Sequence, residues 1–270
     1  MITIHRQRLG ITVLGSGSSG NAVVLHTRSG ALLLDAGFSG RELRRRLELA
    51  EIDGDDIRAI LVTHEHGDHS KGVRVLARRW DVPVYANRCT AEVLCREKND
   101  LPALRIFTAG QPFEVEDFSV VPFSIPHDAI DPVAFTVHWR DVKVGIATDL
   151  GHVSHVIAHH LRECDGLILE CNHDVAMLRD SKRPWSLKRR ILSRHGHLSN
   201  EAGMQLMADV LDRRTQCVIF GHASRECNRY ELVEDAAAKR LQAMGRPDLT
   251  ALVARQDEPL ETCWLEGDAK

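Results

Sequence analysis

The chain has 270 residues, of which 43% are apolar and 27% charged, as in an ordinary soluble globular protein. A formal net charge of −3 excludes a global attraction to nucleic acid, so any such binding must depend on a local basic patch. No apolar run approaches the ~20 residues of a membrane span, and the N-terminus has no signal pattern. We therefore expect one domain over residues 1–270, in the cytoplasm and away from membranes. Seven cysteines without a C-x-x-C pair indicate reduced thiols.

Apolar periodicity predicts strands and helices along the whole chain. Strands are expected at residues 9–14, 22–26, 31–37, 58–62, 81–86, 118–123, 133–138, 143–148, 166–170 and 216–220. Helices are expected at residues 39–49, 70–80, 90–98, 153–163, 200–211 and 231–244. The pattern opens with strands, moves into β-α-β alternation and returns to strands near residue 113. This mixture predicts an α/β fold with sheets and helices in both halves.

A Gly/Ser loop, Gly-Ser-Gly-Ser-Ser-Gly-Asn at residues 15–21, follows the first predicted strand. It matches G-x-G-x-x-G, but a β-rich run follows it where a dinucleotide site requires a helix. We therefore do not expect a dinucleotide here. Two interpretations remain: a tight turn without a ligand, or a loop whose Ser18, Ser19 and Asn21 hold a phosphate.

Three imidazoles and two carboxylates lie within the six residues 64–69, directly after the apolar run 59–62. Neutral imidazoles and carboxylates are the ligands that hold Zn²⁺, Mn²⁺ or Fe²⁺. One loop cannot close such a site alone, so polar residues at later strand ends must contribute. We assign one metal to His64, His66 and His127, and a second to Asp68, His69 and His222, with Asp149 between them. Asp35 is expected to support the site through hydrogen bonds rather than as a ligand.

The H-x-H-x-D-H pattern at 64–69, followed in order by His127, Asp149 and His222, resembles the metallo-β-lactamase superfamily. The resemblance implies an αββα sandwich, two β-sheets flanked by helices, with a dinuclear site at one edge. Further stretches are similar to the YycJ/WalJ-like branch: the Gly/Ser loop, Glu-Cys-Asn-His-Asp at 170–174, Pro-Trp-Ser-Leu-Lys-Arg-Arg-Ile-Leu-Ser at 184–193 and Gly-His-Leu-Ser-Asn-Glu at 196–201. That branch is linked to 5′-to-3′ DNA exonuclease activity.

Two metal ions ~3.5–4 Å apart can generate hydroxide from a shared water at neutral pH and polarise a phosphoryl oxygen. A dinuclear site of this kind, in which Asp68 is expected to be catalytic, would also hydrolyse a lactam or a thioester. Other residues must therefore select the substrate. Glu170 and His197 resemble the Glu–His pair of RNase Z-like nucleases. We expect His197 to be the general acid and Glu170 to orient it, unless His197 only caps the helix that follows. His173 is a rival acid or a phosphate contact.

A basic segment at residues 179–194 contains seven basic residues and one acidic residue. Its Lys188, Arg189 and Arg190 are candidate phosphate contacts, and Trp185 could stack on a base. The alternative is an ordinary solvated face. The sequence thus predicts a phosphodiesterase that uses two divalent metal ions, most specifically a 5′-to-3′ exonuclease with DNA as its partner. Alternatives are an RNA-processing or cyclic-phosphate hydrolase, and a non-catalytic nucleic-acid-binding protein on this fold.

Overall fold

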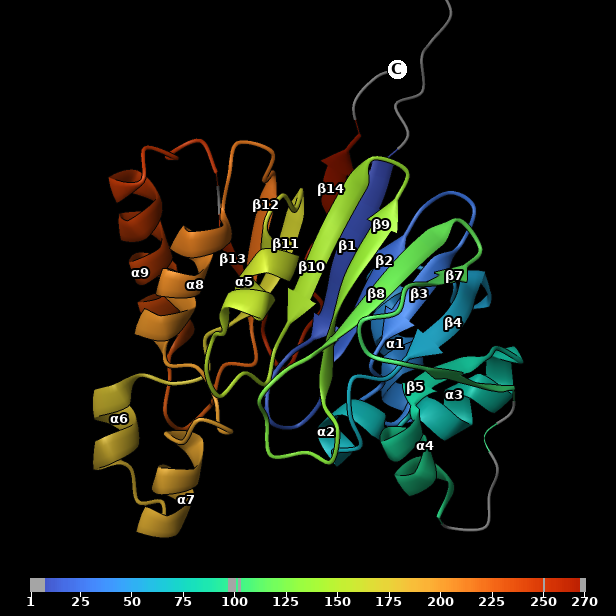
Figure 1. The fold of residues 1–270 in the computed structure, drawn as a ribbon, viewed down its shortest axis with the longest axis horizontal. Coiled ribbons are helices and arrows are strands. Elements are labelled where there is room, and N and C mark those ends of the chain that lie inside the picture. The colour runs from blue at the N-terminus through green and yellow to red at the C-terminus, as the bar shows by residue number, and fades with distance from the viewer. Residues whose placement is uncertain (1–7, 97–100, 102, 250, 268–270) are drawn as a thin grey trace, which may run out of the picture.

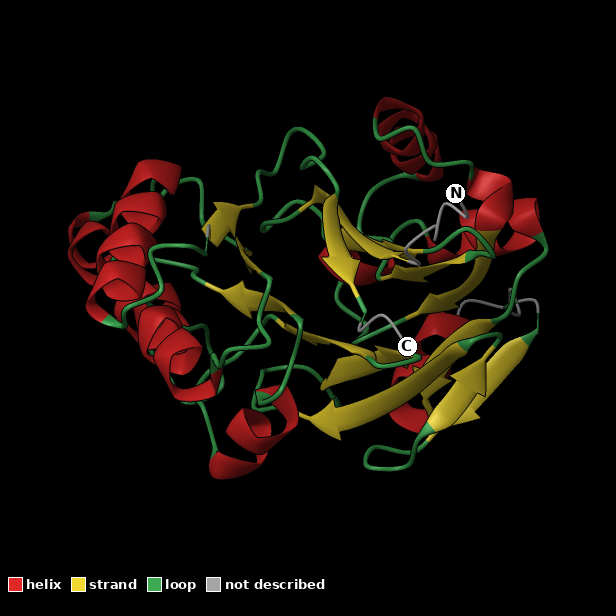
Figure 2. Ribbon diagram, turned by 90° about the horizontal axis from the view of Figure 1, so that it is seen from above, coloured by secondary structure: helices red, strands yellow, loops and turns green. Residues whose placement is uncertain are grey.

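Two β-sheets pack face to face and helices cover both outer faces in the computed structural model (Figures 1 and 2), which describes residues 8–96, 101, 103–249 and 251–267. This αββα sandwich confirms the predicted fold class. The last residues of the helix expected at 90–98 lie outside the described residues. No helix among those described combines the length and apolar character that a membrane crossing requires.

The first sheet has seven strands in the order β14-β1-β2-β3-β4-β5-β6. β1 pairs antiparallel with β14 and β2, β2 pairs antiparallel with β3, and the pairs from β3 to β6 are parallel. The strands are β1 (Arg8–Gly15), β2 (Ala22–His26), β3 (Ala31–Leu34), β4 (Ile57–Leu61), β5 (Val84–Asn87), β6 (Leu104–Phe107) and β14 (Cys263–Glu266).

The second sheet has seven strands in the order β13-β12-β11-β10-β9-β8-β7. Its pairs are antiparallel from β7 to β10 and parallel from β10 to β13. The strands are β7 (Phe113–Val115), β8 (Phe118–Ser124), β9 (Val133–Trp139), β10 (Val142–Ala147), β11 (Gly166–Glu170), β12 (Cys217–Gly221) and β13 (Ala251–Val253).

The helices form one layer on each outer face (Figure 1). The first sheet is covered by α1 (Gly40–Leu49), α3 (Val73–Trp80) and α4 (Arg88–Cys95), and the second by α5 (His155–Leu161), α8 (Asn200–Val210) and α9 (Tyr230–Ala243). The short helices α2 (Gly67–Ser70), α6 (Val175–Asp180) and α7 (Trp185–Ile191) lie at one end of the sandwich.

Alternation along the strands divides the core into layers. In β3, Leu32 and Leu34 face the other sheet, while Leu33 packs under the helices. Both faces of the strand are therefore buried, which explains why its sequence is apolar without interruption. The predicted strands are present, whereas β6, β7, β13, β14, α6 and α7 were not predicted. Gly72 separates α2 from α3 where one helix was expected over 70–80.

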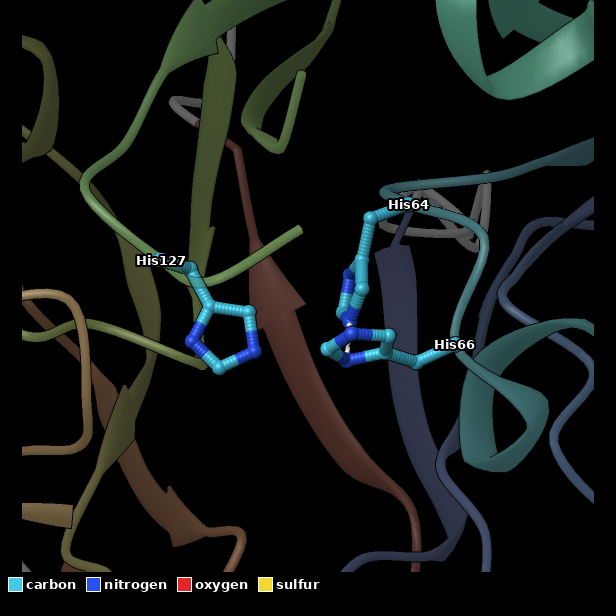
Figure 3. A group of neighbouring side chains, drawn as sticks. All are labelled: His64, His66 and His127. Carbon is cyan, nitrogen blue, oxygen red and sulfur yellow. Dashed lines mark hydrogen bonds between the residues drawn. The ribbon is translucent and has the colours of Figure 1, made fainter. Parts of the chain in front are cut away.

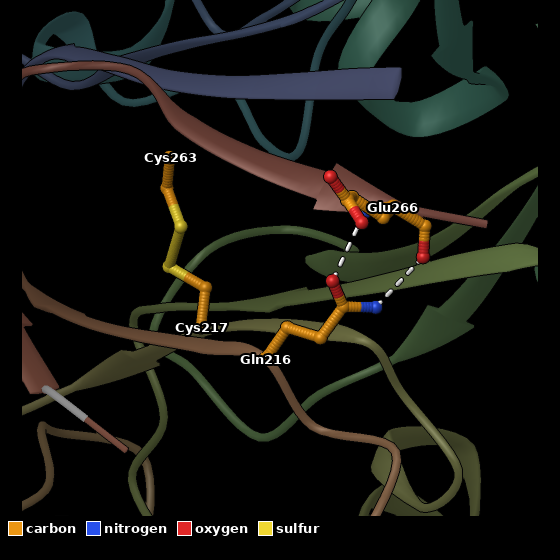
Figure 4. Close-up of a disulfide and its surroundings, with 4 residues drawn as sticks. All are labelled: Gln216, Cys217, Cys263 and Glu266. Carbon is orange, nitrogen blue, oxygen red and sulfur yellow. Dashed lines mark hydrogen bonds between the residues drawn. A yellow bond between two sulfur atoms is a disulfide. The ribbon is translucent and has the colours of Figure 1, made fainter. Parts of the chain in front are cut away.

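A disulfide joins Cys217 at the start of β12 to Cys263 of β14, and therefore links the two sheets (Figure 4). Beside it, the side chain of Gln216 exchanges two hydrogen bonds of 2.9 Å with the backbone of Glu266. The expectation of reduced thiols is wrong for this pair, because strands distant in sequence bring the two sulfurs together. The other cysteines of the described chain are free.

Arg46 anchors the end of β1 from inside the fold. Its side chain is 5% exposed, and its Nη1 donates to the carbonyl oxygens of Leu14 and Gln256 at 2.7 and 3.0 Å. We predict that Arg46→Met lowers the free energy of unfolding by about 2–4 kcal/mol, because two buried acceptors lose a charged donor. Arg44→Met, an exposed change on the same helix, should alter it by less than about 0.5 kcal/mol. Equal denaturation midpoints for the two variants would contradict this role.

Candidate active site

The sequence-predicted site residues converge because several strands end at the same edge of the sandwich. β4 leads into the loop that carries His64. The second sheet ends at the same edge, with Asp149 after β10, Glu170 as the last residue of β11 and His222 after β12. β10, β11 and β12 are parallel neighbours, so their carboxyl ends lie side by side. The predicted ligands therefore come from both sheets and meet between them.

His64, His66 and His127 form the first group, and Figure 3 shows His127 facing the other two from across the gap. His64 Nε2 lies 3.1 Å from His66 Nδ1. Two nitrogens bound to one tetrahedral zinc at ~2.0–2.1 Å lie about 3.3–3.4 Å apart. The His127 ring centroid is 5.2 Å from the centroids of both other rings. The geometry of this group suits one shared ion.

Asp68, His69 and His222 form the second group, with Asp149 beside it. Asp149 Oδ2 lies 3.3 Å from His69 Nε2, and Asp149 Oδ1 lies 3.4 Å from His222 Nε2. Asp149 Oδ1 is also 3.7 Å from His127 Nε2, so this carboxylate reaches both groups. The structure thus brings together all seven residues that the sequence assigned to metal binding.

Two buried polar atoms of this cluster make no hydrogen bond within the described residues: Asp149 Oδ2 and His222 Nε2. A buried polar atom without a partner costs roughly 1–3 kcal/mol, so such atoms call for an explanation. A divalent cation would satisfy both at once. The imidazole and carboxylate donors suit Zn²⁺, Mn²⁺ or Fe²⁺ and do not distinguish between them. The cluster therefore fits divalent metal ions.

Hydrogen bonds to groups outside the cluster orient its imidazole rings, so that one nitrogen of each ring faces the cluster. His69 Nδ1 donates to Asp35 Oδ2 at 2.7 Å, and His64 Nδ1 donates to Thr63 Oγ1, which donates in turn to Asp35 Oδ2. His127 Nδ1 donates to the carbonyl oxygen of Gly196 at 3.2 Å. Each bond turns the other ring nitrogen inward, where it can ligate a metal ion once it carries no proton. The hydrogen bonds predicted for Asp35 are present, and its effect on metal binding stays a prediction.

The buried carboxylates of the cluster raise the pKa of two of its histidines. Burial and the neighbouring imidazoles hold the pKa of His64 well below 6.5, so this ring is neutral. Burial also lowers the pKa of His69, but Asp149 and Asp35 outweigh it and raise that pKa to about 9. The pKa of His222 is raised well above 6.5 in the same way, chiefly by Asp149. Protons on these rings occupy the place of the positive charge that a metal ion would bring.

Three site residues have a left-handed backbone: Asp35, Asp149 and His222, with φ of 59°, 62° and 58°. Such a conformation costs roughly 1–2 kcal/mol in a residue with a side chain, although Asp and His tolerate it better than most. All three lie one or two residues beyond a strand end, where the backbone must turn sharply to aim the side chain into the cluster. The strain therefore coincides with the site.

Glu170 is fully buried and joins two imidazoles at the edge of the cluster. Its Oε1 accepts from His197 Nδ1 at 2.8 Å and from His222 Nδ1 at 3.1 Å. Its Oε2 accepts from the backbone N–H groups of Leu150 and Leu198. Burial raises the pKa of Glu170, but His197 and His222 outweigh it and hold that pKa well below its usual range. Glu170 is thus a fixed, ionised acceptor behind His197.

Three of the predicted phosphate contacts have buried side chains. Lys188 is buried, and its Nζ donates to the carbonyl oxygens of Arg179 and Ser181 at 2.6 Å. Asn21 is buried and bonds within the Gly/Ser loop and to His69. His173 is 1% exposed, and burial lowers its pKa to about 4. Both ring nitrogens of His173 lack a hydrogen-bond partner among the described residues, whereas Lys188 and Asn21 are hydrogen-bonded. The assignment of these three residues as phosphate contacts stays a prediction.

The remaining candidates are accessible to different degrees. Ser18 and Arg190 line a pocket beside His197, together with Arg183, which the sequence analysis did not single out as a contact. Ser19 is exposed and donates its backbone N–H to Gln256. Arg189 is exposed but does not line the pocket. The basic segment therefore divides into structural, pocket-lining and solvent-facing residues.

Known proteins resemble this chain over most of its length. Residues 31–220 match the model of the beta-lactamase superfamily domain. Exodeoxyribonuclease YycJ of Bacillus anthracis is 38% identical over 239 residues, which cover 88% of this chain and 90% of that protein. Exodeoxyribonuclease WalJ of Streptococcus pneumoniae serotype 2 is 38% identical over 85% of this chain and 87% of its own length. The metallo-beta-lactamase fold protein YhfI of Bacillus subtilis superposes with a TM-score of 0.72 over 94% of this chain and 99% of YhfI, at 14% identity, and shares the fold.

The chain therefore belongs to the metallo-β-lactamase superfamily and, within it, to the branch that contains YycJ and WalJ. The similarity predicted from the motif at 64–69 and the stretches near 170, 184 and 196 is confirmed.

The substitution Asp35→Asn tests whether Asp35 supports metal binding by the cluster. Asparagine tolerates the left-handed backbone but cannot accept from His69 and Thr63 with a carboxylate charge. We predict roughly 10–100-fold weaker Zn²⁺ binding, measured by competition with a chromophoric chelator. Asp55→Asn, an exposed change of the same type, should leave the affinity unaltered. Unchanged affinity in Asp35→Asn would contradict the supporting role.

The pKa of His69 predicts how pH affects the metal-free protein. Its folded pKa of about 9 exceeds the ordinary value of 6.5, so the folded state binds the proton more tightly than the unfolded state. The resulting stability is complete below pH 6.5 and is lost as pH rises through 9. We predict that the melting temperature of chelator-treated protein falls over this range, and that added Zn²⁺ removes most of the fall. A flat profile without metal would show that His69 is not protonated.

Proposed function

We propose that this protein is a metal-dependent nuclease that degrades DNA from the 5′ end, and that His64, His66, His127, Asp68, His69, His222 and Asp149 bind two divalent ions. The observation that carries the proposal is the Glu170–His197 pair, which lies against the His/Asp cluster and provides a proton donor for a leaving oxygen. The exodeoxyribonuclease names of relatives 38% identical over most of both chains support DNA as the substrate.

The chemistry divides between the cluster and the pair beside it. Two bound ions would polarise a phosphoryl oxygen and lower the pKa of a water near them. His197 Nδ1 is held by Glu170, so its Nε2 is the atom that can give a proton to the departing oxygen. The His197 ring stacks on that of His222 with centroids 5.0 Å apart, which places the donor directly beside the cluster. Asp68, whose pKa His69 and His222 lower against the opposing effect of burial, remains ionised.

A cleavage assay tests the function as a whole. We expect the unaltered protein to shorten DNA labelled at its 3′ end progressively, and to release the label of 5′-labelled DNA early, with Zn²⁺, Mn²⁺ or Fe²⁺ present. Asp68→Ala should abolish turnover while the circular dichroism spectrum stays unchanged. RNA substrates, run in parallel, test the choice of DNA. Cleavage that continues in Asp68→Ala or in the presence of a chelator would rule out the metal-dependent reaction.

The acid role of His197 predicts a dependence on the leaving group. We predict that His197→Ala lowers kcat on DNA by about 10²–10⁴-fold, because the alkoxide then leaves without a proton. Hydrolysis of bis(p-nitrophenyl) phosphate, whose leaving group needs no proton, should fall far less. His195→Ala, an exposed imidazole two residues earlier, provides the matched control. An equal loss on both substrates would assign His197 a structural role instead.

A further inference from the structure

A pocket opens directly beside the metal cluster and is lined by residues from several segments of the chain, among them Asp128 after β8 and Asn172 after β11. Ser18 of the Gly/Ser loop and His197 line the side next to the cluster. Arg183 and Arg190 line the side formed by the segment from α6 to α7, and Leu187 and Ile191 of α7 supply an apolar wall. α7 lies at the end of the sandwich where α2 and the ligand loops also lie (Figure 1). The pocket therefore continues the active site toward α7.

Both arginines of the pocket are held in place by a carboxylate. Arg183 donates from Nε to Glu226 at 2.9 Å, and Arg190 donates from Nε to Asp128. Among the described residues, the Nη atoms of these two guanidinium groups donate no hydrogen bond. In each arginine, the Nε side of the guanidinium group is therefore held by a carboxylate, while the terminal N–H groups remain available. Such a fork matches the oxygens of a phosphate.

Charge and shape together select the kind of phosphate. A phosphate monoester carries about −1.5 to −2 at pH 7, whereas each diester within a strand carries a single negative charge. Arg183 and Arg190 outnumber the one carboxylate of the lining, Asp128, so the lining has a net positive charge and attracts the more highly charged group more strongly. Leu187 and Ile191 also offer an apolar surface where a continuing strand would need further cationic groups. These features suit the end of a strand rather than its middle.

We propose that this pocket binds the terminal phosphate monoester of a nucleic-acid strand, with Arg183 and Arg190 as the residues that recognise it. The inference rests on the proposed function for the choice of a polymer, and it explains why that function would be directed to an end. For cleavage from the 5′ end, the group in the pocket is a 5′-phosphate.

Competition binding tests the pocket without turnover. Asp68→Asn protein is bound to a fluorescent single-stranded DNA, and unlabelled strands of identical sequence compete with a 5′-phosphate, a 3′-phosphate or no terminal phosphate. We expect the 5′-phosphorylated strand to compete about tenfold better than the unphosphorylated one, the factor that one charge-assisted hydrogen bond supplies. Arg183→Gln and Arg190→Gln should each reduce this ratio toward one.

Arg189→Gln is the matched control, because Arg189 lies on the same helix but outside the pocket. It should weaken binding of all three strands alike and preserve the ratio. Equal competition by all strands, or an equal loss of the ratio in Arg189→Gln and in both pocket variants, would overturn the proposal. A preference for the 3′-phosphate that both pocket variants abolish would support the pocket and reverse the proposed direction of cleavage. A 5′-phosphate preference in a protein that cleaves nothing would support the pocket and refute the nuclease function.

Discussion

The burial of negative charge at one edge of the sandwich is the constraint on which the site depends. Asp35, Asp149 and Glu170 are at most 5% exposed, and transferring an ionised group into a protein interior costs several kcal/mol unless other charges compensate. Imidazoles surround these carboxylates and supply compensation by taking up protons when no metal is bound. The same arrangement favours divalent cations, because they deliver the charge without requiring the rings to be protonated.

Much of this arrangement could be predicted from the sequence because the ligands follow buried strands. An apolar run such as 59–62, which begins within β4, indicates a strand buried on both faces, and the polar residues after it must then lie at a sheet edge. Roles that depend on tertiary packing were harder to predict from the sequence. Lys188 and Asn21 have the chemistry of phosphate contacts, but tertiary contacts commit them to the backbone and to the loop. The helices α6 and α7, with six and seven residues, are too short for periodicity to reveal.

The Gly/Ser loop makes hydrogen bonds that its sequence did not reveal. Asn21 bonds to Ser16 and Gly17 within the loop and to His69, while Ser16 Oγ accepts from the backbone N–H of His222. The loop thus connects the ligand segment of the first sheet to that of the second. Only Ser18, at its tip, faces the pocket beside the cluster. The hydrogen bonds of this loop therefore hold the two ligand segments in place relative to each other.

The link between Cys217 and Cys263 has a consequence for how the two sheets can move. It joins them where β12 begins, while His222 follows the other end of the same strand. The first sheet supplies His64, His66, Asp68 and His69, and the second supplies His127, Asp149 and His222. The sandwich is consequently tied covalently at one end and by ligand contacts at the other. Any separation of the sheets is therefore a hinged opening at the ligand edge, and metal ions bound there would oppose it because their ligands come from both sheets.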